Sequence, residues 1–226
     1  MLRDAGDRRS PGYRQAIGEL CRLYWKPAYA FLRSSRPLDN EHAKDLTQQF
    51  LMEIVEGDFL SRYSPDHGSF RSYLRGALRL FLLEDRRDGA ALKRGGGRAL
   101  VSIDREDAAR LSTKAVGCGS DPEKLFDREW ADSVLEQAVL ALRDELSGGD
   151  RELAFRVFDR YELNPPPEGP PSYADLCREF SQKETDVSNH LQACRRRLRE
   201  LVVLRIRDYV SSEAEVASEL LRLFSK

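Results

Sequence analysis

The sequence contains little cysteine and histidine, and this scarcity excludes several classes of protein. Its four cysteines, Cys21, Cys118, Cys177 and Cys194, are scattered over 226 residues. They are too few for a disulfide scaffold, and their spacing does not fit a zinc ribbon. His190 and Cys194 stand four residues apart, but no second pair lies at a distance suited to zinc. We therefore expect reduced thiols in the core, and neither a metal nor another cofactor.

Long apolar runs are also missing. No stretch reaches the roughly 18 apolar residues of a membrane-spanning helix, and the mean hydropathy is -0.57. The first ten residues are polar and lack the apolar stretch of a signal peptide. With 41% hydrophobic and 33% charged residues, the composition is that of a globular protein with a core. These features predict a cytoplasmic protein that contacts no membrane.

Neither positive nor negative charge dominates the whole chain, but the charged residues are unevenly distributed along it. The formal net charge is -1. Residues 70–98 nevertheless carry eight cations against three carboxylates, and residues 178–207 carry eight against four. The stretch between them is acidic. Two separate basic patches predict two contacts with a polyanion, and ordinary solvated helix faces are the alternative.

Helical periodicity runs through nearly the whole chain, and no alternation typical of a sheet interrupts it. Its pattern disappears from Gly89 to about Glu123, where glycine-rich turns predominate. The prediction is an all-α protein with one domain at 1–88, a flexible linker at 89–123 and a second domain at 124–226. The expected helices span about 10–34, 39–57, 69–88, 126–146, 151–163, 172–180, 183–208 and 212–224.

Local signals mark several helix ends. Ser10, with Pro11 behind it, is a start signal for the first helix. Asp39 or Asn40 can cap the second helix. Ser172 and Asp175 have the spacing of a capping box, which predicts a short helix from this point.

The segment after Ser172 has the outline of a helix-turn-helix: a short helix, a tight turn at 181–183 and a long basic helix. On the long helix one narrow arc is apolar and is expected to pack on the preceding helices; it consists of Val187, Leu191, Cys194, Leu198 and Leu201. On the opposite face of this helix, side chains able to read base edges or bind phosphates predominate. The candidate DNA-binding residues are Lys183, Thr185, Ser188, Asn189, Gln192, Arg195, Arg196 and Arg199.

The helix at 69–88 combines aromatic residues with arginines. Its arginines repeat every four residues, which predicts that they lie along one exposed face. Aromatic rings beside cations are typical of surfaces that capture single-stranded nucleic acid. The aromatic residues Phe70 and Phe81 are better explained as core. The candidate strand-binding residues are Arg71, Arg75, Arg79, Arg86 and Arg87.

No arrangement in the sequence points to catalysis. The run Gly95-Gly96-Gly97 follows no strand and lacks the lysine and hydroxyl of a P-loop. No Ser/His/Asp constellation can be assembled from the spacing, because such triads are recognised by geometry. We therefore expect that the protein is not an enzyme.

Over nearly its whole length the chain resembles extracytoplasmic-function (ECF) sigma factors, two-domain factors of bacterial transcription initiation. Each matching block is weak alone, but their order and spacing together are specific. The blocks are Leu20-Cys21-Arg22-Leu23-Tyr24-Trp25 with Pro27 and Tyr29-Ala30-Phe31; Asp45-Leu46-Thr47-Gln48-Gln49-Phe50; Gly68-Ser69-Phe70-Arg71-Ser72-Tyr73-Leu74; Lys93-Arg94-Gly95-Gly96-Gly97; Phe126-Asp127-Arg128-Glu129-Trp130-Ala131; and Arg195-Arg196-Arg197-Leu198-Arg199-Glu200-Leu201.

The resemblance implies an alternative sigma factor that binds core RNA polymerase and directs promoter recognition. The domain at 1–88 would be region 2, with Asp45, Gln48 and Gln49 docking on the β′ clamp helices and the third helix trapping the melted -10 strand. The domain at 124–226 would be region 4, which contacts the β flap and reads the -35 element of promoter DNA. An anti-sigma or other regulatory protein is a further partner of such factors.

The sequence also departs from the family pattern. His42 and Lys44 stand where carboxylates are usual, Leu80 where asparagine is frequent, and Ser181 where the turn usually has glycine. These departures keep a second hypothesis open. In it, the protein is a degenerate sigma-like protein or a stand-alone helix-turn-helix regulator that acts through a protein partner.

Overall fold

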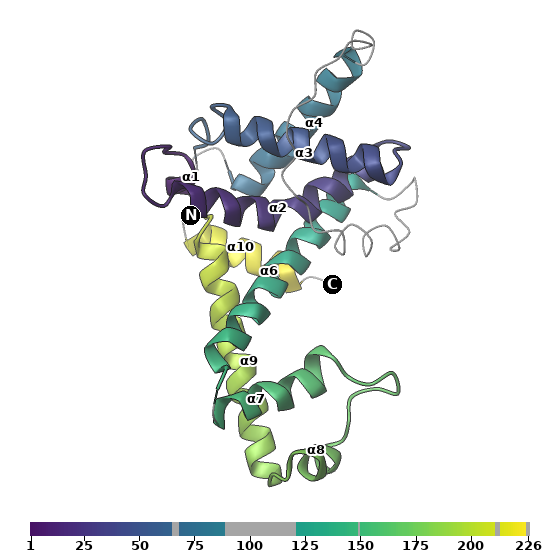
Figure 1. Cartoon of the computed structure of the whole chain (residues 1–226), viewed down its shortest axis with the longest axis vertical. Coiled ribbons are helices and arrows are strands. Elements are labelled where there is room, and N and C mark those ends of the chain that lie inside the picture. Colours follow the sequence, from purple (N-terminus) through teal and green to yellow (C-terminus); the bar gives the residue numbers. More distant parts are fainter. Residues whose placement is uncertain (65–67, 89–120, 149, 211–212, 225–226) are drawn as a thin grey trace. The chain divides into compact units, whose positions relative to one another are not determined.

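The computed structural model describes residues 1–64, 68–88, 121–148, 150–210 and 213–224, and their regular structure is helical throughout (Figure 1). The expected all-α class is thereby confirmed for these residues. Most of the expected linker, residues 89–120, lies outside them. None of the helices in the described ranges combines the length and apolar character needed to cross a membrane.

The chain forms two compact units. The first unit contains residues 1–133 and 208–226, and the second contains residues 134–207. These limits differ from the sequence-based boundaries, which placed everything after residue 123 in one C-terminal domain. Residues 122–133 and the last helix instead belong with the N-terminal helices, because their side chains complete the core of the first unit.

The first unit is built around one long helix, α2 (Tyr13–Ser35), which contacts α1 (Leu2–Ala5), α3 (Asn40–Glu56) and α4 (Phe70–Asp88). The unit's other elements are the first half of α6 (Pro122–Leu146) and α10 (Glu213–Phe224). Helices α2 and α3 pack side by side (Figure 1). The side chains of Leu20, Tyr24 and Tyr29 on α2 are fully buried.

The helix caps predicted at Asp39 and Ser10 can be compared with the observed starts of α3 and α2. Asp39 caps α3 as expected, and its carboxylate accepts a hydrogen bond from the His42 backbone N–H at 2.9 Å. The expected start of the first helix at Ser10 is wrong, because α2 begins at Tyr13. The Ser10 hydroxyl instead donates to Asp4 Oδ1 at 2.9 Å.

Aromatic side chains form much of the core of the first unit. Tyr24 packs edge-on against Phe70, with ring centroids 5.5 Å apart, and lies 6.4 Å from Phe126 of α6. Phe50 of α3 meets Phe81 of α4 at 5.5 Å. The interpretation of Phe70 and Phe81 as core residues is confirmed, since both are at most 5% exposed.

The second unit contains the remainder of α6, α7 (Asp150–Phe158), a π-helical turn η2 (Asp159–Leu163), α8 (Tyr173–Phe180) and α9 (Glu184–Arg207). Four of the five residues of the predicted apolar arc of α9 are buried, and Leu198 is half-buried. Val187, Leu191 and Cys194 are at most 1% exposed, and the Cys194 thiol donates to the Ala154 carbonyl at 3.5 Å. Cys194 is therefore a free core thiol, as expected. Cys21 and Cys177 are also free but only half-buried, so the expectation of core thiols is wrong for these two, and Cys118 lies outside the described residues.

Candidate nucleic-acid interface

The expected order of a short helix, a turn and a long helix is present as α8, residues 181–183 and α9 (Figure 1). Both halves of the capping box form: the Asp175 backbone N–H donates to the Ser172 hydroxyl at 3.2 Å, and the Ser172 N–H donates to Asp175 Oδ2 at 3.1 Å. Hydrogen bonds from the Ser172 hydroxyl and backbone lower the pKa of the Asp175 carboxyl below its usual value. The start of α8 is thus fixed by local chemistry.

The turn contains a strained residue. Ser181 ends α8 with a φ of 54°, in the left-handed region that glycine occupies most readily. The Ser181 backbone N–H donates to the Cys177 carbonyl, and so does Gln182 at 3.0 Å. These bonds close the C-terminus of α8, and Ser181 adopts there the left-handed conformation for which glycine would be the usual residue.

The face of α9 away from the core carries most of the predicted DNA-binding side chains. Ser188 is half-buried and accepts a hydrogen bond from Gln192 Nε2 at 3.4 Å. Within the described residues no ion pair is recorded for the cations among the exposed members. The exposed members are Lys183, Thr185, Asn189, Gln192, Arg196 and Arg199.

Arg195 differs from these residues, because it is held by the protein itself. Its Nε donates to Glu162 Oε1 of η2 at 2.9 Å, and a second bond runs from Nη2 to the same oxygen. Its guanidinium also lies 5.9 Å from the centre of the Tyr161 ring. The bonds to Glu162 raise the pKa of Arg195. The sequence pattern grouped Arg195 with the DNA-binding residues, whereas its contacts connect α9 to η2.

Arg197 is likewise engaged within the second unit. It forms ion pairs with Glu145 of α6 at 2.7 Å and with Glu200 at 2.8 Å. Hydrogen bonds to these carboxylates raise the pKa of Arg197. Arg195 and Arg197 are thus held in ion pairs, whereas Arg196 and Arg199 are exposed cations.

The arginines of α4 correct the sequence-based prediction most clearly. Arg71 was expected on an exposed face, but its side chain is 1% exposed. Its guanidinium binds Asp127 at 3.0 Å and Glu219 at 3.2 Å, and it lies 4.4 Å from the Trp130 ring centre. The expectation is wrong because α6 and α10 cover this part of α4. Arg71 is a buried structural cation.

Arg75 and Arg79 lie further along the same face and are less enclosed. Arg75 is 16% exposed and contacts Asp127 at 3.1 Å and Glu123 at 3.9 Å. Arg79 is 56% exposed and pairs with Glu123. Sequence reasoning missed these carboxylate partners, although the four-residue spacing of Glu123 and Asp127 matches that of the arginines. The side chains of Arg86 and Arg87 lie outside the described part of the chain.

The predicted polymerase-binding residues lie on α3. Asp45 and Gln49 are exposed, and Gln48 is half-buried. Glu41 and Glu53 are also exposed and continue the same four-residue series, which is a signal the sequence offered. The result is an exposed, mainly acidic stripe, hereafter the α3 stripe: Glu41, Asp45, Gln49 and Glu53.

His42 and Lys44 on α3, which stand where carboxylates were expected, each lie beside a carboxylate of the same helix end. The Lys44 ammonium lies 2.7 Å from Glu41 and is partly neutralised by it. The His42 ring lies 2.8 Å from Asp39, and the hydrogen bond to that carboxylate raises the pKa of His42.

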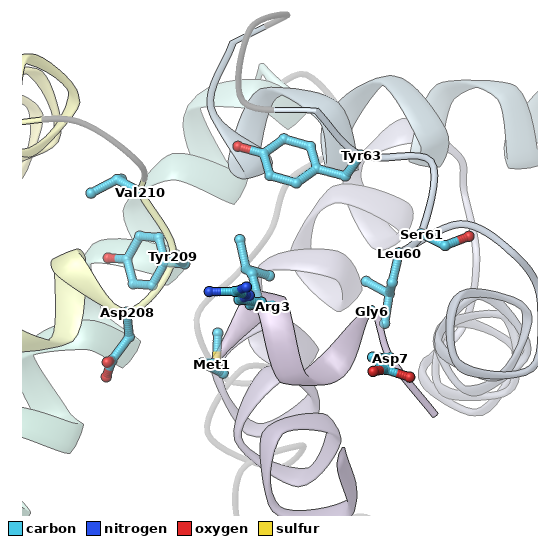
Figure 2. A pocket seen from close by; sticks show the side chains of 11 residues that line it. Met1, Arg3, Gly6, Asp7, Leu60, Ser61, Tyr63, Asp208, Tyr209 and Val210 are labelled. Carbon is cyan, nitrogen blue, oxygen red and sulfur yellow. The ribbon is translucent and has the colours of Figure 1, made fainter. Parts of the chain in front are cut away.

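A pocket of about 490 Å³ also lies within the first unit. Figure 2 shows its lining, with Tyr209 and Val210 on one side and Leu60 and Ser61 on the other. The walls are largely apolar, and Arg3 is among the residues that line it. It does not include any of the predicted nucleic-acid or polymerase contacts.

Comparison with known proteins identified no relative: no protein-family model, no curated protein and no solved structure matches the chain. The two exposed surfaces, the polar and basic face of α9 and the α3 stripe, are therefore interpreted from their own chemistry.

Proposed function

We propose that this protein is an alternative sigma factor, which binds core RNA polymerase and directs promoter recognition through α9. The observation that carries the proposal is the two-sided character of α9 within a helix-turn-helix. Val187, Leu191 and Cys194 face the core, while Asn189 and Arg196 are exposed. A recognition helix needs this division, because one side must fix it to the domain and the other must enter the major groove.

The order of side chains along α9 supports separate roles. Thr185, Ser188, Asn189 and Gln192 come first, and short polar side chains near the start of a recognition helix are suited to reading base edges. Arg196 and Arg199 follow one and two turns later, where cations bind phosphates of the backbone. Lys183 in the turn adds a further cation at the helix start.

Polymerase binding is supported by the α3 stripe. Surface carboxylates and amides in a helical series form a protein-docking surface that needs no deep pocket, and their charge favours a basic partner. In the proposed function this partner surface is the β′ clamp helices, with Asp45 as the central contact.

A second candidate function is a stand-alone helix-turn-helix regulator that works through another partner. It is favoured by the α4 arginines, because Arg71 is buried and Arg75 and Arg79 already have carboxylate partners. This arrangement withdraws part of the surface that a sigma factor uses to hold the melted strand.

Salt titrations of DNA binding test the proposal on α9. Arg196→Ala is expected to weaken binding to all sequences alike and to reduce the salt slope by about one, since one phosphate contact releases about one counterion. Asn189→Ala is expected to relax preference at one position of the upstream element, at a cost of about 1–3 kcal/mol for the matched base. The complete polymerase complex is the appropriate sample.

Arg197→Ala provides the matched control, because Arg197 is on the same helix but is paired with Glu145 and Glu200. It is expected to leave the salt slope unchanged. Equal effects of Arg196→Ala and Arg197→Ala, together with no effect of Asn189→Ala, would mean that this face of α9 does not read DNA.

A further inference from the structure

Two helices of the first unit carry charges that match in spacing. Arg75 and Arg79 on α4 are four residues apart, and so are Glu123 and Asp127 at the start of α6. Asp127 lies 3.1 Å from Arg75, and Glu123 contacts both Arg75 and Arg79. One turn of helix separates each pair of charges by about 6 Å. The carboxylates of α6 thus pair with successive arginines of α4. Successive phosphates of a bound polyanion would pair with these arginines in the same way.

The row of ion pairs that Arg71, Arg75 and Arg79 form, hereafter the ladder, becomes more exposed to solvent along α4. Arg71, the innermost cation, is 1% exposed, Arg75 is 16% exposed and Arg79 is 56% exposed. Glu123, the partner of Arg79, is itself 40% exposed. Solvent-exposed ion pairs contribute little to stability, typically about 0.2–1 kcal/mol. The Arg79 pair can therefore be exchanged for another anion at small cost, whereas the Arg71 pairs cannot.

The surface next to the open end of the ladder is apolar. Leu83 lies four residues after Arg79 on the same helix face and is 53% exposed, and Leu80 is 61% exposed. Exposed leucines beside cations offer apolar contact to unpaired bases while the cations bind the phosphates. An acidic peptide or a simple ion would use the cations alone.

We propose that Arg75 and Arg79 form a binding surface for single-stranded nucleic acid that Glu123 and Asp127 occupy in the free protein. Strand binding displaces Glu123 from Arg79, so the carboxylates of α6 act as an autoinhibitory contact. The proposal deepens the proposed function and rests on it in one respect, namely that the strand is melted promoter DNA. Arg71 keeps its pairs with buried Glu219 and with Asp127, and it anchors the ladder in both states.

Binding of the full chain to a fluorescently labelled oligothymidylate, measured by anisotropy at several salt concentrations, tests this inference. Glu123→Gln removes the carboxylate and leaves the side-chain shape. It is expected to tighten binding by between about 1.4-fold and fivefold, the equivalent of losing a competing exposed pair. The salt slope is expected to stay close to the parent's, because the strand contacts Arg79 in both proteins once Glu123 is displaced.

Two controls separate this effect from a change in net charge. Glu56→Gln removes an exposed carboxylate from the same unit, one with no ion pair recorded among the described residues, and is expected to leave binding unchanged. Introducing Glu123→Gln into an Arg79→Gln background is expected to give a smaller gain, because the released cation is then absent.

The inference is overturned if Glu123→Gln binds the oligothymidylate with the parent's affinity, or if Glu56→Gln gives the same gain. It is also overturned if neither the parent nor any variant binds the oligonucleotide. None of these results bears on duplex recognition by α9, which the Arg196 and Asn189 variants test separately.

Discussion

The buried pair between Arg71 and Glu219 predicts that the last helix stabilises the N-terminal unit. Both side chains are at most 3% exposed, and they meet at 3.2 Å. Arg71→Met leaves the Glu219 carboxylate buried without its cation. Removing one partner of a buried pair costs about 3–5 kcal/mol. Glu219→Gln is expected to cost less, about 1–3 kcal/mol, because Arg71 keeps Asp127 at 3.0 Å.

Tryptophan fluorescence during urea unfolding is a suitable assay, because both tryptophans, Trp25 and Trp130, belong to the first unit. Trp130 is fully buried, and the guanidinium of Arg71 lies 4.4 Å from its ring centre. With a slope of about 2 kcal/mol per molar urea, a loss of about 4 kcal/mol lowers the midpoint by about 2 M.

Two further variants complete this experiment. Arg128→Met makes the same substitution at an exposed position of α6 and is expected to change stability by no more than about 0.5 kcal/mol. The double variant Arg71→Met with Glu219→Gln is expected to lose less than the two single losses combined, since no buried charge is left unpaired. An unchanged midpoint in Arg71→Met, or strictly additive losses, would refute the reasoning.

Three other predictions concern the surface, the capping box and the thiols. Asp45→Arg is expected to weaken binding to core RNA polymerase in a pull-down while thermal unfolding stays within about 0.5 kcal/mol of the parent, and undiminished binding would remove α3 as the docking site. The lowered pKa of Asp175 means that its contribution to stability is present above about pH 3.8 and is lost as the pH falls below that value. Asp175→Asn is therefore expected to lose less helix than the parent over this acid range, as measured by circular dichroism, and identical acid curves would contradict this. Burial raises the pKa of Cys194 to about 11, so native alkylation at pH 8, followed by mass spectrometry, is expected to modify half-buried Cys177 before Cys194.

Features determined by neighbouring residues could be predicted from the sequence. The cap at Asp39, the capping box of Ser172 and Asp175, and the buried arc of α9 all depend on spacings of a few residues. Periodicity therefore located the helix-turn-helix and separated the buried face of α9 from its exposed face. The polymerase-binding residues on α3 came from the family resemblance instead, and of these Asp45 and Gln49 are exposed, whereas Gln48 is half-buried.

The buried position of Arg71 could not be predicted in the same way. Periodicity shows that Arg71, Arg75 and Arg79 share one helix face, but it does not show which other helix covers that face. The partners of Arg71 lie 56 and 148 residues away in the sequence, in Asp127 and Glu219. The same long-range contacts explain why the boundary expected at residue 124 does not match the two compact units.

The central claim, that this protein is a sigma factor whose α9 directs promoter recognition, is tested most directly by co-purification with bacterial core RNA polymerase followed by transcription from promoter DNA. A stable complex that initiates at specific promoters is expected, with initiation reduced by Arg196→Ala and its promoter preference altered by Asn189→Ala. Duplex DNA binding by the isolated chain without any association with polymerase would contradict the claim and favour a stand-alone regulator.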